Sequence, residues 1–188
     1  MRVTPLAVAS AKFSEEQAIE WARADAAMTH PNSSCLDANA AYVLAIRHMV
    51  LNPGDSRGAV RAARGYLSQL KSEVKEWLDE AIEGTLPAAH PQAGYVRIAF
   101  TYAFYHLDQR SPLRSALSET LLQGGDTDTN ACIVGGLIGA YRGATKMMEQ
   151  EGLRRMVGPV LMCDPSLGQD RPDVYHAASA GYWLPKIF

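Results

Sequence analysis

Two carboxylates two residues apart, followed directly by a hydroxyl, are the residues of this sequence best suited to chemistry. Asp126, Asp128 and Thr129 come after a pair of glycines and lead into a segment rich in glycine and alanine. Hard oxygen ligands at this spacing suit Mg²⁺, Mn²⁺ or Ca²⁺ better than zinc. The two glycines allow a sharp turn of the backbone, after which Thr127 or Asp128 is expected to cap a helix.

The same residues also fit a simpler interpretation, in which they only begin a helix. Acids in the first turn of a helix complement the positive end of its dipole. An Asp-x-Asp pair taken alone does not distinguish a metal site from such a helix start. Without a cation between them, Asp126 and Asp128 are expected to raise each other's pKa.

A longer string around these acids resembles a known motif. Residues 124–131 read Gly-Gly-Asp-Thr-Asp-Thr-Asn-Ala, and a run of small residues follows over 135–143. This string resembles the C-terminal metal motif of the ADP-ribosylglycohydrolase family. Residues 1–6 resemble the end of the family's Asn-Gly-x-x-Met-Arg-x-x-Pro-Leu segment, and Thr29 with His30 resembles the Thr-His pair that closes the next helix. The three matches occur in the family's order, so the chain is identified as a member.

The resemblance implies a metal centre, a ligand and a reaction. In the family the motif supplies ligands to two magnesium ions, so Asp126, Asp128 and Thr129 are the expected metal ligands, with Mn²⁺ as an alternative ion. His30 is expected to bind substrate by lining the cleft for ADP-ribose. The implied reaction is hydrolysis of the glycosidic bond between ADP-ribose and its acceptor. The sequence does not predict which linkage is cut.

Two family motifs have no counterpart here. They are a Gly-Asp-Ala-x-Gly segment and a Thr-(Asp/Glu)-Asp-Thr cluster, which supplies the other metal ligands and the catalytic acid. Residues 1–188 are therefore expected to form a single ADP-ribosylglycohydrolase-like domain that lacks the N-terminal part, either as a truncated chain or as a degenerate paralogue. No catalytic residue is assigned, and the chain alone is expected to show no turnover. The alternative function is a non-catalytic ADP-ribose-binding or structural, crystallin-like paralogue.

Caps and apolar periodicity predict an all-α fold, and the resemblance implies the orthogonal multi-helix bundle of this family, without its N-terminal part. Ser14 to Gln17 form a capping box before a helix that His30 and Pro31 end. The last predicted helix carries the metal motif and a surface of small residues, so we expect it to be buried at the centre and crossed closely by another helix. Prolines break the chain repeatedly after Gly152. The remaining helices are expected near 34–50, 56–70, 72–82, 96–107 and 112–123, and the metal-motif helix over 128–148.

Composition narrows the class of protein further. A net charge of −2 without a basic run gives no indication of nucleic-acid binding. Cys35, Cys132 and Cys163 form neither a disulfide framework nor a Cys-x-x-Cys pair, which favours a reducing compartment. No membrane-spanning segment or secretory leader is evident, so a cytoplasmic location is expected. The expected partners are ADP-ribose or an ADP-ribosylated protein, and the oligomeric state is not predicted.

Overall fold

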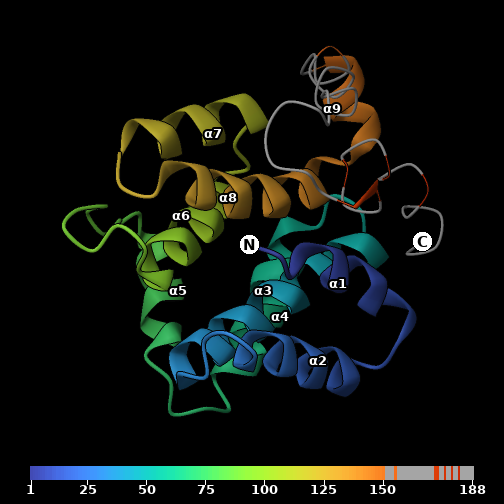
Figure 1. Cartoon of the computed structure of the whole chain (residues 1–188), viewed down its shortest axis with the longest axis vertical. Coiled ribbons are helices and arrows are strands. Elements are labelled where there is room, and N and C mark those ends of the chain that lie inside the picture. Colours follow the sequence, from blue (N-terminus) through green and yellow to red (C-terminus); the bar gives the residue numbers. More distant parts are fainter. Residues whose placement is uncertain (151–154, 156–171, 174–175, 177–178, 180–181, 183–188) are drawn as a thin grey trace. The chain divides into compact units, whose positions relative to one another are not determined.

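The computed structural model describes residues 1–150 and the single residues 155, 172, 173, 176, 179 and 182. Within these residues the regular secondary structure is helical, which confirms the all-α prediction (Figure 1). The chain divides into two compact units, Met1–Gly143 and Ala144–Phe188. One family-type domain over residues 1–188 stays a prediction. The proline-broken region after Gly152 lies almost wholly outside the described residues.

The first unit begins with a short helix that the sequence did not indicate. Helix α1 (Thr4–Ala9) has a proline in its first turn and no side-chain cap, and the 3-10 turn η1 (Ser10–Lys12) follows it directly. Helix α2 (Glu15–Ala27) starts at the predicted capping box. The Ser14 hydroxyl accepts a 3.2 Å hydrogen bond from the Gln17 backbone N–H, and the Gln17 side chain accepts one of 3.2 Å from the Ser14 N–H. This prediction is confirmed.

The other predicted helices are present, with ends that differ by a few residues. Gly84 ends one of them with a φ of +77°, as a glycine after a helix commonly does. The first unit continues with α3 (Ser33–Leu51), α4 (Ser56–Leu67), α5 (Val74–Glu83), α6 (Val96–Asp108), α7 (Leu113–Leu122) and α8 (Thr127–Arg142).

Helix α3, and not α8, lies at the centre of the first unit. Ten of the nineteen residues of α3 are buried, against four of the sixteen of α8. Helix α3 contacts α1, α2, α4, α5, α6 and α8, whereas α8 packs mainly against α6 and α7 (Figure 1). The predicted central position of α8 is therefore wrong, because its first turn and part of its length remain open to solvent.

The metal-motif helix is also shorter than predicted. Helix α8 ends at Arg142, where Gly143 takes a φ of +73° and donates its N–H to the Gly139 carbonyl at 3.0 Å. A positive φ leaves the right-handed helical region, so the helix stops there. A separate helix, α9 (Ala144–Gln150), belongs to the second unit. The apolar pattern continues across this break, so a prediction from periodicity alone treated α8 and α9 as one helix.

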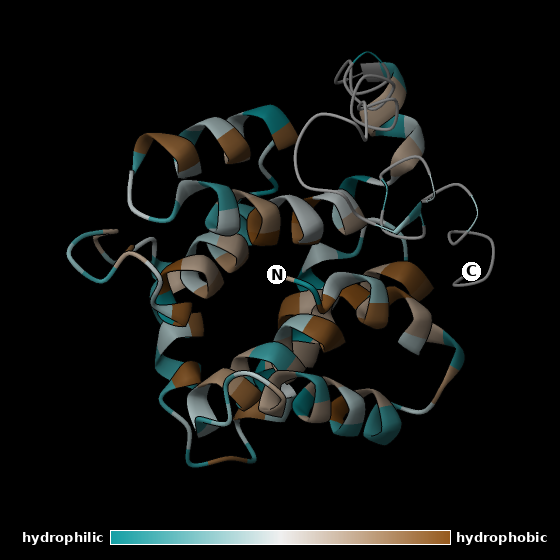
Figure 2. Cartoon of the chain, viewed as in Figure 1, coloured by the Kyte–Doolittle hydropathy of each residue, from teal (hydrophilic) through white to brown (hydrophobic). Residues whose placement is uncertain are grey.

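Burial follows the side chains expected from an amphipathic bundle. Hydrophobic and hydrophilic residues alternate along the ribbons of α2 and α7, each of which packs on the unit with one face (Figure 2). Among the helices of the described residues, none combines the length and the apolar character needed to cross a membrane.

Candidate substrate cavity and metal-motif turn

A tight turn positions the predicted metal ligands at the start of α8. Gly124 and Gly125 have φ values of +76° and +72°, which favour glycine. There is also no room for a side chain at Gly125, because a Cβ there would lie 2.8 Å from the Ala89 carbonyl oxygen. A Cβ on Gly124 would lie 3.2 Å from the His90 Nε2. The loop that precedes α6 therefore packs directly against this turn, and both glycines are required there.

The two acids lie at the N-terminus of α8. Asp126, and not the predicted Thr127 or Asp128, occupies the N-cap position, and its side chain makes no capping hydrogen bond. Asp128 lies in the first turn and is exposed, whereas Asp126 and Thr129 are half-buried. The turn thus leaves both carboxyl groups accessible.

The electrostatics of the pair differ from the prediction. The pKa of Asp128 lies below its usual value, first because of a side-chain hydrogen bond with Asp126 and then because of backbone N–H groups at Thr129 and Asp128. The expectation that the acids raise each other's pKa is wrong for Asp128. Together, the hydrogen bond with Asp126 and the backbone N–H groups at the helix N-terminus stabilise the ionised form of Asp128 more than desolvation disfavours that form.

The predicted substrate-binding residue, His30, lines a cavity. Thr29 and His30 follow α2 and are exposed on this cavity, which has a volume of about 390 Å³. Small-molecule pockets typically measure about 300–1,000 Å³. The Thr29 hydroxyl lies 3.0 Å from the His30 Nδ1, which orients the ring. Apolar side chains from Val96 and Ile133 complete much of the wall.

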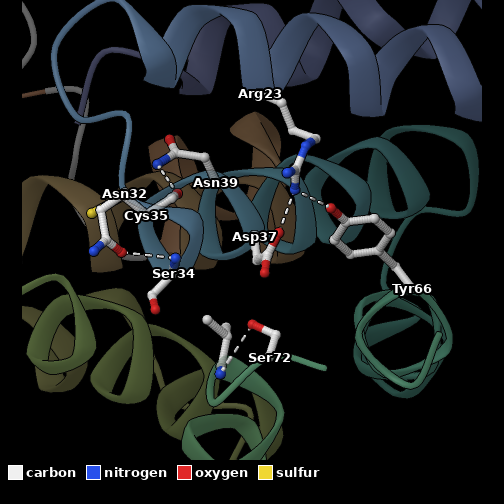
Figure 3. A network of polar contacts seen from close by, with 9 residues as sticks. Arg23, Asn32, Ser34, Cys35, Asp37, Asn39, Tyr66 and Ser72 are labelled. Atoms are coloured by element: carbon white, nitrogen blue, oxygen red, sulfur yellow. Dashed lines mark hydrogen bonds and ion pairs between the residues drawn. The ribbon is translucent and has the colours of Figure 1, made fainter. Parts of the chain in front are cut away.

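The other polar groups of the cavity come from the residues before α1, from α2 and from α3. Arg2 precedes α1, Asp25 lies on α2, and Cys35 and Asn39 lie on α3. The Asn39 side chain donates a 2.8 Å hydrogen bond to the Cys35 carbonyl, which fixes the amide one turn further along α3 (Figure 3). Burial raises the pKa of the Cys35 thiol, so this sulfur is not an activated nucleophile.

Comparison with known proteins decides the family. Residues 1–170 match the model of the ADP-ribosylglycohydrolase family. The chain belongs to the ADP-ribosylglycohydrolase family. No curated protein and no solved structure matches it. The match to residues 1–170 confirms the family that the three sequence motifs indicated.

In this ADP-ribosylglycohydrolase-family chain, helix α8 links the acidic turn to the cavity. Ile133 lines the cavity, and Thr129 lies one turn earlier on the same face, about 6 Å along the helix axis. Asp126, Asp128 and Thr129 are not themselves among the lining residues. The structure thus brings Thr29 and His30 into the cavity and leaves the three predicted metal ligands beside it.

The donor set fits a hard cation only in part. Two accessible carboxyl groups that approach within hydrogen-bonding distance of each other, with a hydroxyl in the next position, suit Mg²⁺. Among the residues that the structure describes, no group of three or more His, Cys, Asp or Glu side chains is arranged to hold a metal. Asp126 and Asp128 fit as one side of a centre whose other ligands must come from elsewhere.

Sequence reasoning missed several cavity residues. Asp25 and Asn39 carry no motif, and Arg2 lies in the family-like segment 1–6, to which no role in the site was assigned. The spacing of Cys35 and Asn39, four residues apart on a predicted helix, was the one pattern that placed two of these residues on a common face.

Proposed function

We propose that this chain binds ADP-ribose, free or attached to a protein, in the cavity beside His30. We further propose that it serves hydrolysis of the glycosidic bond of that group. The observation that carries the proposal is the position of Thr29 and His30: the pair selected by family resemblance lines a cavity of about 390 Å³ in a chain whose residues 1–170 match the family model. A mostly apolar wall with a few convergent polar groups is typical of nucleotide-sized ligand sites.

Each polar group has a role that its chemistry allows. The His30 ring, oriented through Nδ1 by Thr29, presents Nε2 to a ligand oxygen. Asn39 offers an amide from α3, and Val96 and Ile133 provide apolar surface for a base or a ribose face. Binding through a few fixed groups orients the ligand and lowers the entropic cost of a later reaction.

Asp126, Asp128 and Thr129 are proposed to hold magnesium at the edge of this site. The ion, when bound, orients the ribose hydroxyls and a water molecule, as a Lewis acid does in metal-assisted hydrolysis. The chain's own contribution is to keep both carboxyl groups accessible and to favour the ionised form of Asp128. The lowered pKa of Asp128 and the position of Asp126 at the N-cap support that contribution.

Binding without catalysis is the second candidate function. Hydrolysis needs a carboxylate that manages the proton of the attacking water. Asp126 and Asp128 share a hydrogen bond and would both be engaged as metal ligands, so neither is free as a proton acceptor. This observation favours an ADP-ribose-binding role for the chain taken alone.

Calorimetric titration with ADP-ribose tests the shared part of both candidates. His30→Ala should weaken binding about tenfold, which corresponds to about 1.4 kcal/mol and to one good hydrogen bond. Glu20→Ala, on the exposed face of the same helix, is the matched control and should bind as the parent does. Equal affinity of parent and His30→Ala, or no binding by the parent, would contradict the proposal. Release of ADP-ribose from serine-linked and arginine-linked peptides then separates the hydrolase from the binding protein.

A further inference from the structure

Arg2 donates hydrogen bonds to the last turn of α2 from two of its nitrogens. Its Nε donates hydrogen bonds of 3.1 and 3.3 Å to the two carboxylate oxygens of Asp25. Its Nη2 donates a 2.6 Å hydrogen bond to the backbone carbonyl oxygen of the same residue. One guanidinium therefore holds both the side chain and the main chain of Asp25, which a single positive charge on a lysine would not reproduce.

The position of Asp25 explains why this contact matters. Asp25 lies in the last turn of α2, where carbonyl groups lack partners further along the helix. Its carbonyl accepts only a long 3.3 Å bond from the Met28 N–H within the helix end. A carboxylate at this end also opposes the helix dipole. Arg2 satisfies the carbonyl and compensates the carboxylate together.

The turn that Arg2 holds is the one that presents His30. The His30 N–H donates a 2.8 Å hydrogen bond to the Ala26 carbonyl, the next carbonyl after that of Asp25. The His30 ring is in turn tied to the Thr29 hydroxyl at 3.0 Å. Any loosening of the last turn of α2 therefore moves the imidazole relative to the cavity wall on α3.

We propose that Arg2 is a positioning residue for His30: it fixes the C-terminal turn of α2 and thereby sets where the imidazole lies in the cavity. The inference rests on the proposed role of His30 in ADP-ribose binding. It assigns to Arg2 an effect that acts through Asp25 and His30, because Nε and Nη2 are already engaged with Asp25.

A double-mutant cycle measures whether Arg2 acts through His30. Arg2→Ala should weaken ADP-ribose binding about fivefold or more, and Arg2→Lys should show an intermediate loss because the fork geometry is missing. In a His30→Ala background, Arg2→Ala should cause almost no further loss, since coupled residues are not additive. Full additivity would mean that Arg2 contacts the ligand directly, and would overturn the inference.

Nuclear magnetic resonance of the ligand-free protein tests the inference independently of binding. The ring signals of His30 should shift in Arg2→Ala and, to a smaller extent, in Arg2→Lys. Arg57→Ala, at an exposed arginine of α4, is the control and should leave the His30 signals in place. Unchanged His30 signals in both Arg2 variants would overturn the inference. A parent that binds no ADP-ribose refutes the proposed function instead, while the ring signals still decide the role of Arg2.

Discussion

The hydroxyl oxygen of Tyr42 lies only 2.5 Å from the position that a Cβ atom would take on Gly136, where α3 crosses α8. The same hydroxyl donates a 2.8 Å hydrogen bond to the Ile133 carbonyl and lies 3.2 Å from the Thr4 hydroxyl. Three helices therefore meet at one buried phenol, and burial raises the pKa of Tyr42 well above its usual value. This contact explains why position 136 of α8 is a glycine.

Gly136→Ala should destabilise the protein by about 1–3 kcal/mol, because the added methyl group displaces the Tyr42 and Thr4 hydroxyls. Gly65→Ala on α4 is the matched control, since a Cβ there meets nothing within 4 Å. The control should gain up to about 1 kcal/mol from its better helix propensity. Urea denaturation of the three proteins measures both effects. Equal stability of Gly136→Ala and the parent would show that α3 and α8 do not cross this closely.

The helices could be predicted because their determinants are local. The Ser14–Gln17 capping box and the glycine after α5 lie within a few residues of the ends that they define. Helix α1 was missed because its six residues carry no cap and too few positions for a periodic pattern. The break at Gly143 was missed because apolar periodicity does not report the sign of φ.

The site could be predicted only where a motif marked it. The family resemblance indicated His30, and the structure places it on a cavity, yet the convergence of Arg2, Asp25 and Asn39 brings together the N-terminal turn, α2 and α3. Such convergence depends on how α1, α2 and α3 pack, and neither propensity nor spacing within one helix contains that information. The central position of α3 likewise depends on how the helices pack, and not on residues close to it in the sequence.

Magnesium should bind to the parent protein weakly, through the turn before α8. Asp126→Asn and Asp128→Asn should each reduce the affinity by about tenfold or more, because each removes a charged oxygen ligand. Glu20→Gln, an exposed acid on α2, is the control and should bind as the parent does. Calorimetric titration with Mg²⁺ alone measures the three variants. Tight stoichiometric binding that survives Asp128→Asn would place the metal elsewhere.

A partly buried ion pair with a tyrosine hydroxyl joins α2, α3 and α4. The Arg23 Nη1 donates hydrogen bonds to the buried carboxylate of Asp37 and, at 2.9 Å, to the Tyr66 hydroxyl (Figure 3). Asp37→Ala should cost about 1–3 kcal/mol, because a guanidinium that is only 35 % exposed loses its charged partner. Tyr66→Phe should cost less, about 0.5–1.5 kcal/mol, for one hydrogen bond.

The pair Arg64 and Asp79 provides the comparison for this prediction. It is 2.6 Å long but lies at the surface, with both side chains more than 40 % exposed. Asp79→Ala should therefore cost no more than about 1 kcal/mol. Thermal or urea unfolding measures all three variants. If Asp79→Ala proved as costly as Asp37→Ala, burial would not be what makes the Arg23 network important.

The stability of the protein should fall as the pH drops below 7, and His106 should account for part of the fall. His106 is fully buried, and its Nδ1 lies 3.1 Å from the Ser111 hydroxyl. Its Nε2 has no hydrogen-bond partner within the described residues. Burial lowers the pKa of His106 below its usual value of 6.5, and Glu119 opposes this effect only in part.

The direction of this change in stability follows from proton binding to His106 in the folded and unfolded states. Near pH 6.5 the unfolded chain takes up a proton on His106, whereas the folded protein takes it up only at lower pH, so acid favours unfolding. The loss begins as the pH falls through 6.5, with a slope of at most about 1.4 kcal/mol per pH unit, and is complete below the folded-state pKa.

His106→Gln should flatten the dependence of unfolding free energy on pH between about 7.5 and 5.5. Glu119→Gln should extend the loss to lower pH, because it removes the charge that raises the pKa of His106. Urea denaturation at each pH measures the three curves, and an unchanged slope in His106→Gln would show that this histidine is not the group that titrates.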